Sequence, residues 1–398
     1  MTASNELFKL SEPEVQALLQ LLGSPSGKPV DLSRKNLANA DLKGRKMRGA
    51  RLSGSNLSGS TLSDADLSDA DLFGANLSNA NMERADLSRA VLRGVSLKSA
   101  NLNHAKLIGT DLRGGVILDA SGSASFGLEV TDLSNCLAEY ATATRAQLSG
   151  VDLSGASLIG ADLADAVLFG ANLSKTDLSF CNLRGANLSD THLTNTKLIG
   201  ADLTGANLSN ARPENALLQA AILDGAQLAG FDLGNCETAE DLPSADPESL
   251  DPQVRDTLKL HELWLASGGR EGRPGTLAGR NLSYTDLSER KLSGMSFAGA
   301  KLVGAKLDRC QLMLCNFADA DLMAASLTGA NLKGAQFNRS NLMRGRFDGA
   351  IVGGIVMRDA QGTLTGRTQQ TAFLRANLAK ASFAGVNLKE CAMDGTRA

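Results

Sequence analysis

Residues 65–80 read ADLSDADLFGANLSNA, and a leucine returns at every fifth position of this stretch. The same spacing runs without a slip from Leu32 to Leu112 and on to Ile117, so an internal repeat decides the fold. Three further blocks keep this spacing: Leu148 to Leu233, Leu277 to Met357, and Phe373 to Met393. The repeated unit of five residues therefore fills most of the 398-residue chain.

A period of five fits neither of the two common secondary structures. An amphipathic helix repeats its buried face every ~3.6 residues and a half-buried strand every ~2, so neither keeps these leucines on one face. The pattern instead predicts a coil that turns a corner once in each repeat. With four sides, a turn takes about 20 residues, and successive turns pair at ~4.8 Å, the usual distance between strands. Each backbone polar group then finds its partner in the turn above or below.

Two of the five positions are expected to face inward. One is the leucine, and the other lies two residues earlier and is nearly always small, as at Ala65, Ala70 and Ala75. The six cysteines all fall in this small position, so we interpret them as core residues and not as ligands or nucleophiles. They are Cys136, Cys181, Cys236, Cys310, Cys315 and Cys391.

Three phenylalanines test the length of the turn. Phe297, Phe317 and Phe337 occupy leucine positions and are spaced by 20 residues, and Met357 follows at the same interval. If a turn takes 20 residues, these four side chains stack in one column on one face of the coil.

The tandem pattern A-[DN]-L-x-x resembles the pentapeptide-repeat family. It is seen, for example, in Ala65-Asp66-Leu67-Ser68-Asp69 and in Ala171-Asn172-Leu173-Ser174-Lys175, and it covers about three quarters of the chain. The resemblance implies a right-handed quadrilateral parallel β-helix. The expected fold is therefore an all-β solenoid of this kind, with short α-helical caps and insertions.

Two helices are expected outside the repeats. Ser11-Glu12-Pro13-Glu14 has the form of a capping box, and Asp251-Pro252 begins a second helix that runs past His261 and Trp264 to Gly268. A solenoid exposes apolar core at its ends, so these helices are expected to act as caps. Packing of Trp264 on a solenoid end is favoured over a recognition face made by His261 and Trp264.

Together these signals predict eight segments. They are a capping helix within 1–30, repeats at 31–118, an irregular break or degenerate coil at 119–147, repeats at 148–236, an acidic linker with a helix at 237–276, repeats at 277–357, a loop at 358–372, and a short repeat block at 373–398.

The chain looks like a tandem duplication. The motif D-A-x-G-[ST] ends a repeat block at Asp119 and again at Asp359, 240 residues later. The first break keeps Leu128 and Leu133 in step with the repeat and is open to interpretation as a degenerate turn. The two breaks are the least repetitive parts of the chain, so they are the leading candidates for specific recognition.

No arrangement of residues suggests catalysis. The chain has no C-x-x-C pair, and its histidines, His104, His192 and His261, are far apart and lack a surrounding motif. The Asp and Asn residues before each leucine recur as a feature of the scaffold. We therefore expect no enzyme, no metal and no cofactor.

Charge varies along the chain although the totals nearly balance, with 40 Lys and Arg against 43 Asp and Glu. Residues 146–236 hold 4 basic and 9 acidic residues, whereas residues 277–398 hold 16 and 9. Such asymmetry steers partners, although it also serves solubility. The candidate interaction surface consists of Arg34, Lys35, Arg45, Arg48, Arg51, Arg344, Arg346, Arg358 and Arg367.

These observations favour a non-enzymatic, cytoplasmic scaffold that binds an unidentified protein partner on its flat faces and at the two breaks. Nucleic acid is not expected as a partner, and no segment approaches the apolar length of a membrane span. The coil that ends near Met393 is expected to favour self-association.

Two alternative functions remain open. Some members of the family resemble B-form DNA in size and charge and modulate type II topoisomerases such as DNA gyrase. Those members are uninterrupted acidic rods with phenylalanine at most central positions and a C-terminal dimerising helix, and this chain departs from them in each respect. The other alternative is binding to anions or to a membrane surface through the basic residues.

Overall fold

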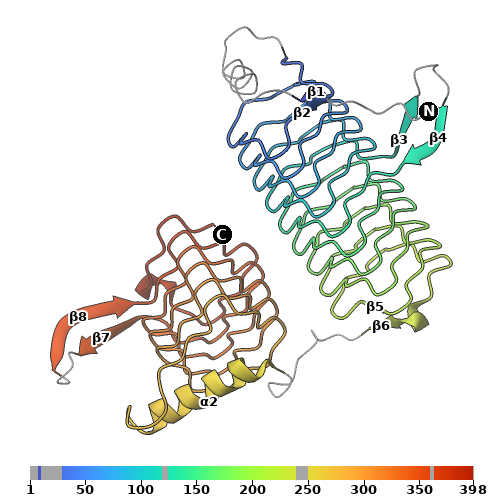
Figure 1. Cartoon of the computed structure of the whole chain (residues 1–398). Coiled ribbons are helices and arrows are strands. Elements are labelled where there is room, and N and C mark those ends of the chain that lie inside the picture. The colour runs from blue at the N-terminus through green and yellow to red at the C-terminus, as the bar shows by residue number, and fades with distance from the viewer. Residues whose placement is uncertain (1–7, 10–28, 119–123, 239–249, 359–362, 398) are drawn as a thin grey trace. The chain divides into compact units, whose positions relative to one another are not determined.

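The computed structural model describes residues 8–9, 29–118, 124–238, 250–358 and 363–397. The chain divides into two compact units, Met1–Asp241 and Leu242–Ala398 (Figure 1). The expected first helix lies outside the described residues. The elements are β1 (Phe8–Lys9), β2 (Lys35–Asn36), β3 (Gly115–Leu118), β4 (Ala124–Glu129), β5 (Ala216–Leu217), η1 (Leu233–Asn235), β6 (Cys236–Glu237), α2 (Pro252–Ala266), β7 (Gly354–Arg358), β8 (Leu364–Gln370) and η3 (Leu388–Glu390).

Each unit is a solenoid whose coils pair with one another in parallel. The residue before each central leucine bridges to the residue 20 positions later, as in Asp66↔Asp86 and Asp71↔Val91. Such bridges recur every five residues, so each coil has four sides, as Figure 1 shows for both units. The expected 20-residue turn is confirmed.

The repeat sequence is explained by the corner between two sides. The N–H of Ala65 donates to the carbonyl oxygen of Leu62 at 3.1 Å, which closes a four-residue turn, and Asp64 within it has a φ of 60°. This positive φ is what a type II turn requires at its third residue. The Asp or Asn before each leucine accepts from the N–H two residues on, as Asp66 does from Ser68 at 3.1 Å. This local bond is why Asp and Asn fill that position.

The core of each coil consists of the two predicted inward positions. Leucines such as Leu67 and alanines such as Ala70 are 1% exposed or less. Four cysteines in the alanine position are buried in coil interiors. The thiols of three of them donate to the carbonyl 23 residues earlier, for example at 2.9 Å from Cys181 to Leu158 and at 2.8 Å from Cys310 to Leu287. The interpretation of the cysteines as small core residues is confirmed for the four that are buried, whereas Cys236 and Cys391 are half-buried.

The structure corrects the expected break at 119–147. Strands β3 and β4 form an antiparallel hairpin in which Val116 pairs with Leu128, so Ile117 and Leu128 are not repeat positions. Regular coil resumes at Thr131, and Asp132 bridges to Ser96, 36 residues earlier. The alternative of a degenerate coil is therefore confirmed for residues 131–147, where alanine fills two central positions, Ala138 and Ala143.

The expected loop at 358–372 is also a hairpin, formed by β7 and β8, and it projects from the second solenoid (Figure 1). Met357 belongs to β7, so its predicted place in the phenylalanine column was wrong. The column is otherwise confirmed, with ring centroids 4.9 Å apart for Phe297 and Phe317 and 4.8 Å for Phe317 and Phe337. Phe373, 36 residues after Phe337, continues it at 5.0 Å.

Helix α2 caps the first coil of the second unit. Asp251 accepts from the N–H of Gln253 at 2.7 Å, and Val254 and Leu258 are buried in one cluster with the coil residue Leu277. His261 is fully buried, and its Nδ1 accepts from the N–H of Gly275 at 3.0 Å. The predicted helix and its capping role are confirmed, and His261 lies within the packing and not on an exposed recognition face.

The phenylalanine column predicts a large effect of truncation. Phe317→Ala removes a ring stacked on both sides and is expected to cost about 3–5 kcal/mol of unfolding free energy. Phe317→Leu restores the residue found at most central positions and is expected to cost clearly less. Urea unfolding followed by circular dichroism measures both, and equal losses for the two variants would contradict the stacking account.

Burial of His261 predicts sensitivity of the cap to acid. Burial lowers the pKa of this imidazole below 6.5, although backbone groups of Ser293 and Leu292 oppose the shift. Because the folded state favours the neutral form, its stabilising effect is complete above pH ~6.5 and falls as the pH drops below that value. The melting temperature of the second unit should therefore fall between pH 6.5 and 5. In His261→Asn, which keeps an acceptor but does not titrate, this fall should be smaller.

Candidate functional site

The basic residues of the first repeats do not form one surface. Arg34 and Arg48 are exposed on different sides of the first coil, whereas Arg51 is exposed at the start of the second coil. Two of the three form ion pairs: Arg48 with Asp69 at 3.0 Å and Arg51 with Asp31 at 3.9 Å. Lys35 and Arg45 occupy the small inward position of their repeats and are half-buried. These five residues therefore ring the start of the solenoid.

The basic residues of the second unit are divided between the coil and the hairpin. Arg344 and Arg346 lie on one coil, where Arg346 is exposed and Arg344 half-buried. Arg358 ends β7, and Arg367 lies exposed on β8. The structure thus places two of the nine predicted residues on a projecting element.

The β7–β8 hairpin is anchored at its base by side-chain hydrogen bonds to the coil. Gln369 donates from Nε2 to the carbonyl of Gly334 at 2.6 Å, and Gln336 donates from Nε2 to the carbonyl of Gln370 at 2.9 Å. Thr371, where the coil resumes, donates from Oγ1 to the carbonyl of Leu332 at 2.8 Å. These contacts fix the point at which the hairpin leaves the coil.

Packing at the base also requires a glycine. Gly334 has a φ of 72°, and a Cβ there would lie 2.8 Å from Cγ2 of Ile355. The close approach brings one face of the hairpin against the coil at its base. Beyond the base the side chains of β8 are largely exposed.

Sequence reasoning missed the exposed apolar residues of this element. Val356 is 48% exposed and Leu364 57%, and Ile351 on the adjoining coil is 50% exposed. A signal was present, because the step from Val352 to Phe373 is 21 residues and shifts the five-residue register by one. The step from Leu112 to Leu133, at the other hairpin, is also 21 residues and shifts the register in the same way.

The β3–β4 hairpin has the same pairing register as the β7–β8 hairpin. Its pairs Val116↔Leu128 and Leu118↔Ala124 are matched, 240 residues later, by Val356↔Thr368 and Arg358↔Leu364, with the same irregularity between them. At both sites the hydroxyl oxygen of the threonine that resumes the coil lies close to the carbonyl oxygen before the hairpin, at 3.0 Å between Thr131 and Arg113 and 3.1 Å between Thr371 and Gly353.

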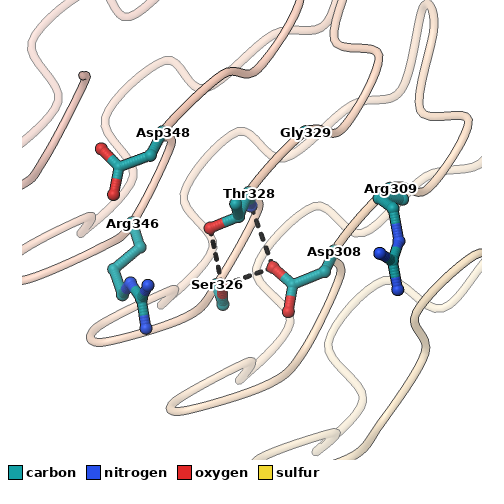
Figure 2. A pocket seen from close by; sticks show the side chains of 7 residues that line it. All are labelled: Asp308, Arg309, Ser326, Thr328, Gly329, Arg346 and Asp348. Atoms are coloured by element: carbon teal, nitrogen blue, oxygen red, sulfur yellow. Dashed lines mark hydrogen bonds between the residues drawn. The ribbon is translucent and has the colours of Figure 1, made fainter. Parts of the chain in front are cut away.

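A shallow hollow of ≈ 360 Å³ lies on another part of the second solenoid (Figure 2). It lies between coils where Ser326 replaces the usual Asp or Asn. Asp308 of the preceding coil takes over the missing bond and accepts from the N–H of Thr328 at 2.9 Å and from the hydroxyl of Ser326. The lining residues are Asp308, Arg309, Ser326, Thr328, Gly329, Arg346 and Asp348.

The carboxylates of this hollow are hydrogen-bonded to neighbouring coils. Asp348 accepts from the hydroxyl of Ser382 and from the N–H of Ala384 at 2.8 Å, and these bonds lower the pKa of its carboxyl below 3.8. Arg309 forms an ion pair with Glu289 at 2.7 Å. An acid held in its ionised form suits bonding to the backbone and not proton transfer.

Other chemistry is similarly unsupported in the described parts of the chain. They contain no group of three or more His, Cys, Asp or Glu residues that could hold a metal ion. They also contain no helix with the length and apolar character needed to cross a membrane. Burial raises the pKa of Cys136, Cys310 and Cys315 to about 12, which keeps these sulfurs as unreactive thiols.

The family model described as Pentapeptide repeats matches residues 36–114, 131–235 and 281–359, which is more than half of the chain. The chain belongs to the pentapeptide-repeat family. The gap at residues 115–130 coincides with the β3–β4 hairpin, and the gap at 236–280 contains α2. The match is to a structural repeat and not to a catalytic family.

Among solved structures, this pentapeptide-repeat chain is similar to HetL from the cyanobacterium Nostoc sp. strain PCC 7120, a pentapeptide repeat protein involved in heterocyst differentiation regulation. The identity is 32% over 58% of this chain and 98% of HetL, with a TM-score of 0.30. Rfr23 from the cyanobacterium Cyanothece 51142 is 28% identical over 36% of this chain and 88% of Rfr23, with a TM-score of 0.21.

Full-length QnrB1, a plasmid-mediated fluoroquinolone resistance protein, is 18% identical over 50% of this chain and 89% of its own, with a TM-score of 0.21. A comparison with curated protein sequences gave no match.

The raised thiol pKa values predict slow modification of the cysteines. At pH 8 the folded chain should react slowly with a disulfide reagent that releases a chromophore, first at the half-buried Cys236 and Cys391, whose pKa burial raises to about 11. All six thiols should react rapidly after unfolding in guanidinium, which serves as the control. Rapid reaction of more than two thiols in the folded chain would contradict this assignment.

Proposed function

We propose that this chain is a non-enzymatic, cytoplasmic scaffold that binds a protein partner, and that the β7–β8 hairpin is its main docking element. The supporting observation is that this hairpin leaves the solenoid and presents Val356, Leu364 and Arg367 to solvent. Exposed apolar residues next to a cation are common at sites of protein recognition.

The coils supply a rigid support. Arginines on the outer corners pair with acids one coil away, as Arg84 does with Asp64 at 2.7 Å and Arg339 with Asp319 at 2.6 Å. Such exposed pairs add little stability, but they balance charge along the corner. The alternation of acid and base differs from the continuous negative surface that a mimic of DNA needs, so the topoisomerase alternative is the weaker one.

The handedness of the solenoid is also proposed. We infer a right-handed quadrilateral β-helix, because connections between parallel paired segments of one sheet are right-handed in the great majority of proteins. The family resemblance implies the same hand.

The remaining basic residues form a secondary proposal. Arg34, Arg48 and Arg51 on the first two coils, together with Arg344 and Arg346, are candidates for contacts with anionic partners or membrane surfaces. Ion pairing of Arg48 and Arg51 reduces their free charge. Nucleic acid is not proposed as a partner.

Self-association is proposed through the last described coil of the second unit. Phe383, Val386, Leu388 and Met393 are only partly buried there, whereas the equivalent residues of inner coils are almost fully buried. A further copy of the chain would cover this apolar surface.

The docking element can be removed without disturbing the repeat. Deletion of residues 355–370 joins Val352-Gly353-Gly354 to Thr371-Ala372-Phe373 and restores a five-residue step, because the hairpin adds 16 residues to a 20-residue turn. Deletion of residues 115–130 joins Leu112-Arg113-Gly114 to Thr131-Asp132-Leu133 in the same way and is the matched control.

Affinity capture from the native cytoplasm tests the proposal. We expect a protein partner that is retained by the intact chain and by the variant lacking 115–130 but lost from the variant lacking 355–370. Unchanged melting curves would show that both variants fold. Retention of every captured protein by both deletion variants would move the docking site to the coils and contradict the proposal.

A further inference from the structure

The outer edge of β7 is open and regular. Within the described residues β7 pairs with β8 alone. From Val356 to Arg358 β7 advances two residues while β8 advances four, from Thr368 to Leu364, so the bulge lies on β8 around Gly366, whose φ is 71°. A bulge disrupts pairing along the strand that carries it. Of the two strands, β7 is therefore the one suited to accept a further strand.

The charge around this edge is positive. Strands β7 and β8 contain Arg358 and Arg367 and no acidic residue. Exposed lysines flank the base, with Lys333 on the preceding coil and Lys389 on the following one. The carboxylate of Glu390, which also lies at the base, accepts from Nδ2 of Asn387 at 3.0 Å. The cations therefore outnumber the acids around the hairpin.

The apolar residues suit an extended partner. Val356 lies on β7 itself and is 48% exposed. A segment that pairs with β7 would place alternate side chains on the same face as Val356 and the others on the opposite face. Pairing of the main chain then supplies affinity, and the alternate side chains supply specificity.

The β3–β4 hairpin provides an internal comparison. It has the same register and the same bulge, but Leu118 and Gly127 stand where β7–β8 has Arg358 and Arg367. The only charged residue in its strands is Glu129. The two hairpins therefore share their backbone pairing, but the strands of β7–β8 carry positive charge and those of β3–β4 carry negative charge.

We propose that an extended, acidic segment of a partner protein adds to the outer edge of β7 as a third strand, and that Arg367, Lys333 and Lys389 select its carboxylates. This inference rests on the proposed scaffold function and assigns the chemistry of the partner at the same site. The β3–β4 hairpin shares the geometry but does not select acidic segments.

The test uses two labelled peptides of about ten residues, one alternating valine with glutamate and one alternating valine with lysine, and measures fluorescence anisotropy with the full chain. The acidic peptide is expected to bind the intact chain and the variant lacking 115–130. Its affinity should fall at least tenfold in the variant lacking 355–370 and in Lys333→Glu with Arg367→Glu. Salt should weaken the binding.

A hairpin exchange gives a second readout. Residues 355–369 are replaced by the sequence of residues 115–129, which has the same length and register. Affinity for the acidic peptide should be lost, and the lysine peptide should not bind better to the intact chain than to the exchanged one. The charge-reversed variant keeps the test valid if the exchanged chain does not fold.

Each outcome is decisive. Equal binding of the acidic peptide by the intact chain and by the variant lacking 355–370 would overturn the inference. So would the absence of binding to the intact chain. If peptide binding is absent but cytoplasmic capture still depends on residues 355–370, strand addition fails while the scaffold function stands.

Discussion

The parallel pairing of each coil with the next is the constraint on which the rest of the structure depends. The N–H of Leu67 donates to the carbonyl of Asp86 at 2.7 Å, and the N–H of Asp86 donates to the carbonyl of Ala65 at 2.9 Å. Because this exchange recurs on every side, every coil has the same outline. The interior therefore accepts a large side chain at one position and a small one at another, and the five-residue pattern follows.

The same constraint directs variation to the outside of the coil. Extra residues that remained in a coil would move every later bridge out of register. The chain instead leaves the coil between two sides and returns to the same point, which raises the bridge step from 20 to 36 residues at both hairpins. A hairpin that leaves and re-enters the coil at the same point is free to diverge in sequence. Arg358 and Arg367 thus stand where the other hairpin has Leu118 and Gly127, although the pairing register is the same. The proposed docking element therefore lies where the repeat is interrupted.

The charge pattern of the sequence predicted the proposed docking site only in part. Arg48, Arg51 and Arg339 belong to basic stretches, but each forms an ion pair with an acid on another coil. Residues 20 apart become neighbours along a corner, so the local field depends on that interval and not on blocks of consecutive residues. Arg367 was predicted as a candidate, whereas its surroundings, Val356 and Lys333, could not be named before the hairpin was known.

The sequence by itself determined the repeat, the length of the turn, the inward place of Cys181 and Cys310, the column of Phe297, Phe317 and Phe337, and the second helix. These features depend on spacing, because pairing at a fixed interval makes a local pattern sufficient. Only the tertiary structure decided that 115–129 and 354–370 are hairpins, that Phe373 and not Met357 continues the column, and that α2 buries His261. The shift of the five-residue register marks where the repeat is interrupted, but it does not say how the intervening segment folds or what it packs against, because those depend on contacts between residues far apart in the sequence.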